Sequence, residues 1–321
     1  MDEVRAASGP EFDRLAALSE EAWYERILAG YQPDSAPRGV LCGYPSEELQ
    51  ANTVGCAGRA ALTFPFRFWV DVRQSCGRLG VALTPSTRIL DFGCGWGRIT
   101  RFFFRDTSPE NITGIDVDTE FIGICRRIMS GGTYQVVDPL PPTDLPSGSF
   151  ELVVGYSVFS HLAQHAADAW MKELARLLKP GGLLAVTIRP RQFLDYCESL
   201  KGTKARVRRW LSAFRGTRAP AHPYLEALAG MFPDFGEARR RYDAGEFVYA
   251  PLGGGGPRDR SFYGEALIPE RYVRQAWAPH LLLRDFRFDP DRHELTLMVL
   301  QKPQEPQASG ATTPQGSRDP D

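Results

Sequence analysis

The feature that most constrains this chain is the stretch RILDFGCGWGR at residues 88–98, in which an apolar run is followed by an acid and three alternating glycines. The apolar residues predict a buried strand that ends near Asp91, and the turn contains Gly93, Gly95 and Gly97. Apolar residues at helical spacing follow, so we expect a helix to begin near Gly97. Strand, glycine turn and helix in this order let bare backbone approach an extended ligand closely.

The chemistry of this turn points away from a phosphate. Its glycines follow the spacing Gly-x-Gly-x-Gly, which differs from the dinucleotide fingerprint, and no Gly-Lys-Ser/Thr follows. Asp91, in front of the turn, suits a cationic group better than a pyrophosphate. We expect Asp91 to accept hydrogen bonds from an ammonium group while the N–H groups of the turn receive a carboxylate, which together describe an amino acid. The alternative is a glycine-rich turn that binds nothing.

A second predicted strand, ITGID, also ends in an acid, Asp116. It lies about 25 residues beyond Asp91, which is close to the length of one βαβ unit, so both acids are expected at the carboxyl edge of neighbouring strands. A carboxylate at that position accepts both hydroxyls of a ribose, and Val117 would pack against an adenine. Helix capping is the alternative role for Asp116, although Asp118 serves that role equally well.

Two more segments complete the pattern: SFELV at residues 149–153 and ELARLLKPGGLLAVT at residues 173–187. With the glycine turn, they resemble the class I S-adenosylmethionine-dependent methyltransferases. The resemblance implies an α/β, Rossmann-like seven-stranded fold with a terminal antiparallel hairpin, S-adenosylmethionine as cofactor and S-adenosylhomocysteine as product. Asp138 stands where the family's acid contacts the adenine amino group, although Pro139 departs from the family pattern. The cofactor-binding residues implied are Asp91, Gly93, Cys94, Gly95, Gly97, Arg98, Asp116, Val117, Asp138 and Tyr156.

The catalytic residues are expected just past the fourth strand, because ligands of open α/β sheets lie over the carboxyl ends of the strands. His161 is the candidate base, since the ordinary pKa of imidazole suits proton removal at neutral pH. Tyr156 would position the substrate or flank the sulfonium. A packing or capping role in the first turn of a helix is the alternative for His161. His161 and His165 are four residues apart, but no third ligand is evident, so we predict no metal site.

The chain is expected to divide into four parts: a helical N-terminal cap at 1–85, a methyltransferase core at 86–190 and 265–302, an inserted substrate lid at 191–264 after the fifth strand, and a disordered tail at 303–321. The cap is expected to cover the ligand, with Arg59 and Phe66 as candidate contributors.

The predicted lid contains an amphipathic helix with many basic residues and no acid between Lys201 and Arg218. Three interpretations remain open for it: a solvated face over a packed apolar stripe, a grip on an anionic acceptor, or a nucleic-acid contact. The near-zero net charge and the lack of an RNA-binding module disfavour nucleic acid. The substrate-binding candidates are Arg206, Trp210, Phe214, Tyr249 and Tyr263.

The overall composition, with 43% hydrophobic and 24% charged residues and a net charge of −1, is typical of a globular protein with a sizeable core. No apolar run approaches the ~20 residues of a membrane span, and we expect a cytoplasmic monomer or homodimer. Six scattered cysteines predict reduced, mostly buried thiols.

These patterns together predict methyl transfer to an oxygen of a small-molecule acceptor such as a natural product, metabolite or saccharide. Three alternatives stay open: a cofactor-binding protein with a cyclase-like activity, an RNA or protein methyltransferase, and a nicotinamide oxidoreductase. The last would require Gly-x-Gly-x-x-Gly, which this turn lacks.

Overall fold

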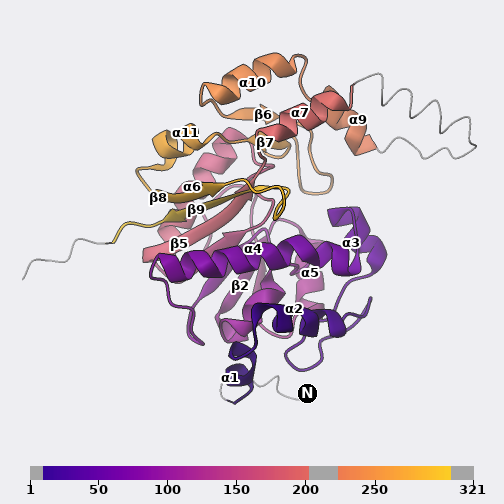
Figure 1. The fold of residues 1–321 in the computed structure, drawn as a ribbon, viewed down its shortest axis with the longest axis vertical. Coiled ribbons are helices and arrows are strands. Elements are labelled where there is room, and N and C mark those ends of the chain that lie inside the picture. The colour runs from indigo at the N-terminus through magenta and orange to yellow at the C-terminus, as the bar shows by residue number, and fades with distance from the viewer. Residues whose placement is uncertain (1–9, 202–222, 305–321) are drawn as a thin grey trace, which may run out of the picture.

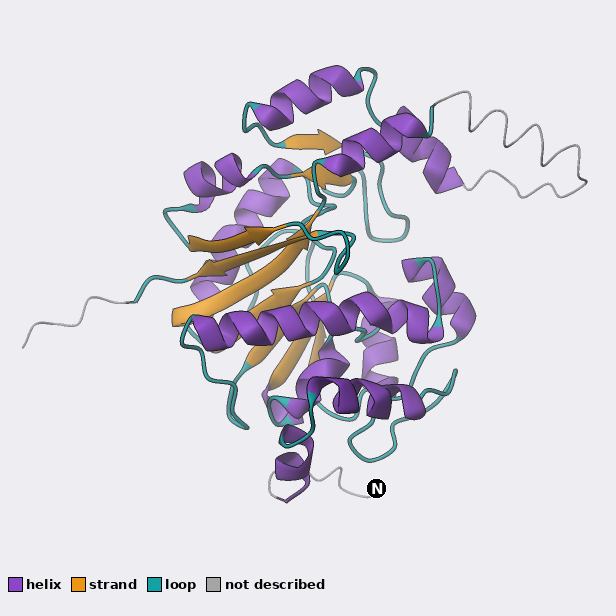
Figure 2. Ribbon diagram, viewed as in Figure 1, coloured by secondary structure: helices purple, strands orange, loops and turns teal. Residues whose placement is uncertain are grey.

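The computed structural model describes residues 10–201 and 223–304 and has a seven-stranded sheet at its centre (Figures 1 and 2). The strand order is β3-β2-β1-β4-β5-β9-β8; β1 to β5 run parallel, and β9 is antiparallel to both of its neighbours. The strands are β1 Ile89–Phe92, β2 Ile112–Asp116, β3 Thr133–Val136, β4 Phe150–Gly155, β5 Leu178–Ile188, β8 Leu282–Arg287 and β9 Thr296–Gln301. The predicted Rossmann-like sheet with a terminal antiparallel hairpin is confirmed.

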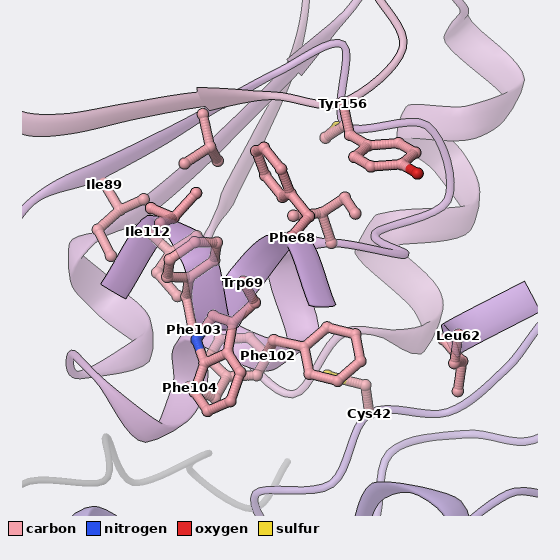
Figure 3. Close-up of a cluster of buried hydrophobic side chains, with 14 of the residues drawn as sticks. Cys42, Leu62, Phe68, Trp69, Ile89, Phe102, Phe103, Phe104, Ile112 and Tyr156 are labelled. Atoms are coloured by element: carbon pink, nitrogen blue, oxygen red, sulfur yellow. The ribbon is translucent and has the colours of Figure 1, made fainter. Parts of the chain in front are cut away.

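The central strands are buried on both faces, so alternate residues of one strand enter different hydrophobic cores. Ile89 of β1 packs into the core beneath α4 (Gly58–Arg78), whereas Leu90 packs against α6 (Gln164–Leu177) on the other face. Figure 3 shows the first of these cores, where Phe68 and Trp69 of α4 lie over the sheet. Burial on both faces explains why these strands appear in the sequence as continuous apolar runs rather than alternating ones.

The described part of the N-terminal segment contains four helices, of which α4 is the longest. Its other helices are α1 Pro10–Ala16, α2 Glu20–Ala29 and α3 Glu47–Val54. Ser19 and Ser46 cap α2 and α3 by accepting hydrogen bonds from backbone N–H groups of the first turn. Figure 1 shows α4 lying across one face of the sheet, with α1 and α2 beyond its lower edge.

The segment after the glycine turn differs from the prediction. Instead of an α-helix beginning near Gly97, residues 95–99 form successive turns, and a 3-10 helix, η1, runs over Thr100–Arg105. Every side chain of η1 is buried, including three consecutive phenylalanines. An amphipathic α-helix exposes one face, whereas this segment is enclosed by the cap and the sheet, and it makes i→i+3 bonds such as Phe102 N–H to the carbonyl of Ile99.

The predicted lid forms a group of elements at the top of Figure 1 with its own small hydrophobic core. The described elements are α7 Gln192–Ser199, α9 Pro223–Gly230, α10 Phe235–Asp243 and β6 Val248–Ala250, and β6 pairs antiparallel with β7 Glu265–Leu267. Leu194, Phe235 and Val248 are buried together in this core. The predicted basic amphipathic helix lies outside the described residues.

The remaining elements connect the sheet to its covering layers. They are η2 Pro109–Asn111, α5 Thr119–Ile128, α11 Glu270–Tyr272 and the π-helical turn η3 Val273–Trp277. All six cysteines are free thiols, and five of them are buried, as predicted. Within residues 10–201 and 223–304, no helix combines the length and apolar character needed to cross a bilayer.

Candidate functional site

The glycine turn after β1 has left-handed backbone at all three glycines, with φ of +70° at Gly93, +52° at Gly95 and +77° at Gly97. A Cβ at Gly93 would lie 2.4 Å from Val158 Cγ2, and a Cβ at Gly97 would lie 2.4 Å from Met129 Sδ. A Cβ at Gly95 would meet no described atom within 4 Å. Gly93 and Gly97 are therefore required by packing as well as by φ, whereas Gly95 faces open space where a ligand can approach the backbone.

The backbone N–H groups of the turn are already engaged within the protein. Those of Gly93 and Cys94 both donate to the carbonyl of Ile115, that of Gly95 donates to Asp116, and that of Gly97 donates to the carbonyl of Cys94. The expectation that these N–H groups receive a carboxylate is therefore wrong for these four residues.

Asp91 is enclosed at the end of β1, with 1% of its surface exposed. Its Oδ2 accepts a hydrogen bond from Thr100 Oγ1 at 2.5 Å. Burial raises the pKa of Asp91 to about 7; the Thr100 bond acts against this rise, and the charge of Asp116 adds to it. Among the described residues no cationic side chain forms an ion pair with Asp91, so a cationic group on a ligand would compensate its charge.

Asp116 ends β2 beside the glycine turn, as predicted. Its Oδ1 accepts from the N–H of Asp118 and its Oδ2 from the N–H of Gly95, both at 2.9 Å. Burial raises the pKa of Asp116, and these two hydrogen bonds act against the rise. A carboxylate offers about four acceptor positions, so two backbone donors leave capacity for the hydroxyls of a ribose.

The residues predicted to contact adenine lie at the same edge of the sheet. Val117 is half-buried directly after β2, and Asp138 is exposed two residues beyond β3. The N–H of Val137 donates to the carbonyl of Asp116 at 3.0 Å, which holds the two loops together. The structure thus brings these residues to one edge, and their adenine contacts stay predictions.

Tyr156 and Arg98 face each other where β4 ends. Arg98 Cζ lies 5.3 Å from the centroid of the Tyr156 ring, and Phe68 of α4 meets that ring edge-on at 5.2 Å. Arg98 Nη1 donates to the carbonyl of Ala61 at 3.4 Å, and burial lowers the pKa of Arg98. The Tyr156 hydroxyl, labelled in Figure 3, is buried and has no hydrogen-bond partner among the described residues, so it has capacity to bond a ligand.

His161 lies in a turn before α6, not in its first turn as the alternative supposed. Its Nδ1 is 2.8 Å from the carbonyl oxygen of Gly264, and its ring stacks on Tyr263 with centroids 4.8 Å apart. A carbonyl only accepts, so Nδ1 carries the proton and Nε2 presents its lone pair. The Oγ of Ser157 lies 3.5 Å from Nε2, and Ser157 itself has a φ of +61°.

Sequence reasoning missed a buried carboxylate beside His161. Glu265 of β7 is 1% exposed and lies 3.4 Å from His161 Nδ1, 2.9 Å from Arg189 Nε and 2.7 Å from the Tyr224 hydroxyl. Its only sequence signal is an isolated acid at the start of the apolar run EALI. Arg258, which was also missed, pairs with Asp118 at 3.1 Å and brings the lid to the Asp116 edge.

Of the five predicted substrate-binding residues, the structure describes only Tyr249 and Tyr263, and these two have different surroundings. Tyr263 stacks on His161, whereas the Tyr249 hydroxyl donates to the carbonyl of Arg260 at 3.2 Å. Arg206, Trp210 and Phe214 lie outside the described residues.

The two cap residues proposed as contributors face elsewhere. Arg59 pairs with Glu25 at 3.0 Å on the surface, and Phe66 stacks on Tyr24 with centroids 4.3 Å apart. The cap instead reaches the site through the carbonyl of Ala61 and the ring of Phe68. In the described parts of the chain, no three His, Cys, Asp or Glu side chains are grouped to hold a metal, and His165 is exposed on α6.

A sheet of this order, with acids at the carboxyl ends of β1 and β2 around a glycine turn, is the Rossmann-like methyltransferase fold. Residues 89–182 match a family described as a methyltransferase domain. This part of the chain is therefore similar to methyltransferase domains, and its fold is that of the class I, S-adenosylmethionine-dependent type.

Individual relatives are similar over the same part of the chain. A 2-methyl-6-phytyl-1,4-hydroquinone methyltransferase of Synechocystis sp. is 33% identical over 106 residues, 32% of this chain and 32% of that protein. A malonyl-(acyl-carrier protein) O-methyltransferase of Enterobacter lignolyticus is 36% identical over 103 residues, 31% of this chain and 38% of that protein. The chain thus spans about a third of the length of these relatives.

Among solved structures, an S-adenosylmethionine-dependent methyltransferase from Clostridium acetobutylicum superposes with a TM-score of 0.48 and 12% identity, over 80% of this chain and 97% of that one.

Proposed function

We propose that this protein transfers a methyl group from S-adenosylmethionine to an oxygen of a small-molecule acceptor. The observation that carries the proposal is the pair of buried carboxylates, Asp91 and Asp116, on either side of a glycine turn within a domain that matches methyltransferases. The relatives' names support a small acceptor: they include a hydroquinone, a fatty-acid and a trans-aconitate methyltransferase.

The residues present fit the cofactor. Asp91 receives its ammonium group, Asp116 its ribose hydroxyls, and Gly95 leaves room for its chain over the turn. Because the turn N–H groups are engaged, Arg98 is the cation that binds the carboxylate. Val117 and Asp138 contact the adenine. The cofactor supplies a methyl group already activated by a sulfonium cation, so the protein's task is mainly to orient the acceptor and exclude water.

The acceptor lies between the carboxyl end of β4 and the insertion. His161 Nε2 accepts the hydroxyl proton of the acceptor as the oxygen attacks the methyl carbon, and Tyr156 and Tyr263 line the pocket. In this proposal residues 1–85 form the cap, 86–190 and 265–302 the core, and 191–264 the insertion that covers the acceptor. Anionic groups on the acceptor would meet the basic residues of the insertion.

A thermal-shift titration tests the cofactor. We expect S-adenosylhomocysteine to bind in the micromolar range and to raise the melting temperature, whereas NADH has no effect. Asp116→Asn should weaken the response, since it removes the charged acceptor of the ribose hydroxyls. A flat response of the wild-type protein to S-adenosylhomocysteine would refute the proposal. A metabolite screen with radiolabelled S-adenosylmethionine then identifies the acceptor, and His161→Ala should lower turnover without changing cofactor affinity.

A further inference from the structure

Glu265 is an enclosed acid near the proposed reaction centre, with 1% of its surface exposed, and groups from three separate parts of the chain converge on it. Arg189 Nε donates to Oε2 at 2.9 Å from just beyond β5, and the Tyr224 hydroxyl of α9 donates to Oε1 at 2.7 Å. His161 Nδ1 lies 3.4 Å from the same Oε1. The carboxylate therefore joins the insertion, the end of the sheet and the turn that carries His161.

The carboxylate is ionised at neutral pH. Burial alone would raise the pKa of Glu265, but His161 and Arg189 outweigh burial and hold it at about 2. Arg189 is the cation in this pair, and its guanidinium also stacks over Phe193 at 4.2 Å. A buried carboxylate this well supplied with donors keeps a fixed negative charge at one position.

His161 has its other contacts fixed as well. The carbonyl of Gly264, the residue before Glu265, accepts a hydrogen bond from Nδ1–H at 2.8 Å, and Tyr263 covers one face of the ring. The charged and titratable groups facing His161 are thus Glu265 and, behind it, Arg189, with the phenols of Tyr263 and Tyr224 nearby. Of these consecutive residues, Tyr263 stacks on the ring, Gly264 accepts a hydrogen bond from its Nδ1–H, and Glu265 places a negative charge beside it.

We propose that Glu265 is a positioning residue for His161: the Gly264 carbonyl fixes the Nδ1-protonated tautomer, and the charge of Glu265 beside the ring stabilises the imidazolium that forms when Nε2 accepts a proton. The inference rests on the proposed function and deepens it. The acceptor O–H bond breaks and its proton passes to Nε2; the oxygen's electron pair forms the new bond to the methyl carbon. The C–S bond breaks with its electrons left on sulfur, so charge and atoms balance.

A purely structural role for Glu265 is the competing explanation, since its ion pair with Arg189 also anchors the insertion. The chain offers a matched control for that role. Arg191 and Asp243 form a second ion pair, at 2.7 Å, between α10 and the residue before α7, and it makes no contact with His161. Asp243→Asn removes an anchoring charge of the insertion without removing a charge beside the imidazole.

The experiment is ¹⁵N NMR of the full-length protein labelled at its histidines, followed over pH, with His161→Gln used to assign the resonance. In the wild type we expect the Nδ1-protonated tautomer. Glu265→Gln should move the half-protonation of His161 to lower pH by about one unit, a tenfold loss of proton affinity, because a neighbouring negative charge is gone. Glu265→Asp keeps the charge but retracts it, and should give a smaller downward shift. Asp243→Asn should give none.

The outcomes separate the two roles. An unchanged midpoint in Glu265→Gln, or an equal shift in Asp243→Asn, overturns the positioning role. If Glu265→Gln does not fold, Glu265→Asp decides alone, and an unshifted midpoint in that variant overturns the proposal. The titration is read in the free protein, so failure of S-adenosylhomocysteine to raise the melting temperature refutes the proposed function separately.

Discussion

The guanidinium of Arg258 lies 3.1 Å from the carboxylate of Asp118, two residues after the proposed ribose ligand Asp116. Arg258 also covers the ring of Phe121, with its Cζ 5.4 Å from the centroid. Because Arg258 belongs to the insertion and Asp118 to the loop after β2, this pair ties the insertion to the edge of the sheet where the cofactor is proposed to bind. Tyr263 of the same insertion stacks on His161, so the insertion contacts both the proposed ribose edge and the proposed base.

We expect Arg258→Ala to raise the dissociation constant of S-adenosylhomocysteine about fivefold, since a partly buried ion pair of about 1 kcal/mol no longer holds this loop in place. Isothermal titration calorimetry measures the change. The surface pair Arg274–Glu270, at 2.7 Å, gives the control, and Arg274→Ala should leave the constant unchanged. Equal constants for the wild type and Arg258→Ala would show that the pair does not bear on cofactor binding.

Substitutions at two glycines of the turn should have different effects, one on the stability of the fold and the other on cofactor binding. Gly97→Ala places a Cβ against Met129 and should lower the free energy of unfolding by about 3 kcal/mol. Gly95→Ala meets open space and should cost only about 1 kcal/mol from its positive φ, yet it should abolish the thermal response to S-adenosylhomocysteine. Chemical denaturation and thermal shift measure the two effects. Retained cofactor binding in Gly95→Ala would place the ligand elsewhere.

Asp91 should make the free energy of unfolding fall as the pH rises. Its pKa is about 7 in the folded protein against an ordinary 3.8, so between these values the folded state binds more protons than the unfolded state. Stability therefore falls as pH rises from 4 to 7, by no more than about 4 kcal/mol. Asp91→Asn should flatten this part of the wild-type profile, measured as melting temperature against pH. An unaltered profile would mean that Asp91 has an ordinary pKa.

Asp71 in α4 should be a stability determinant of the cap. It accepts from His293 Nε2 at 2.6 Å and from Arg292 Nη2 at 2.7 Å, so it fastens the cap to the turn between β8 and β9. Asp71→Asn should lower the free energy of unfolding by about 3 kcal/mol in urea titration. Asp285→Asn, which removes a more exposed pair with Arg78, is the control and should cost less than about 1 kcal/mol.

Protonation of Asp71 in acid should weaken its bonds to His293 and Arg292, as the Asp71→Asn substitution does. Burial would raise the pKa of Asp71, but the hydrogen bonds from His293 and Arg292 outweigh it and lower the pKa. A lowered pKa means that the stabilisation is present above pH 3.8 and is lost as the pH falls through the folded-state value. The free energy of unfolding of Asp71→Asn should therefore fall less in acid than that of the wild type. If the variant shows the same fall, other carboxylates cause it.

Tyr156→Phe should leave folding intact and reduce turnover. The hydroxyl is buried without a described partner, so its removal should leave the melting temperature unchanged or slightly raised. If the hydroxyl orients the acceptor or the cofactor, turnover should fall about tenfold, measured with radiolabelled methyl donor and the acceptor found by screening. A lower melting temperature with normal turnover would make Tyr156 a packing residue.

The sequence alone determined the sheet, the glycine turn and the acids at the carboxyl ends of β1 and β2, because each depends on local spacing along a strand or turn. Three outcomes required the tertiary structure. Enclosure of residues 100–105 on all sides replaced the expected α-helix with a 3-10 helix, and engagement of the turn N–H groups by Ile115, Asp116 and Cys94 removed them as donors. The pairing of His161 with Gly264 and Glu265, about a hundred residues later, arises only when the insertion folds back over the sheet, since no local pattern encodes a contact at that separation.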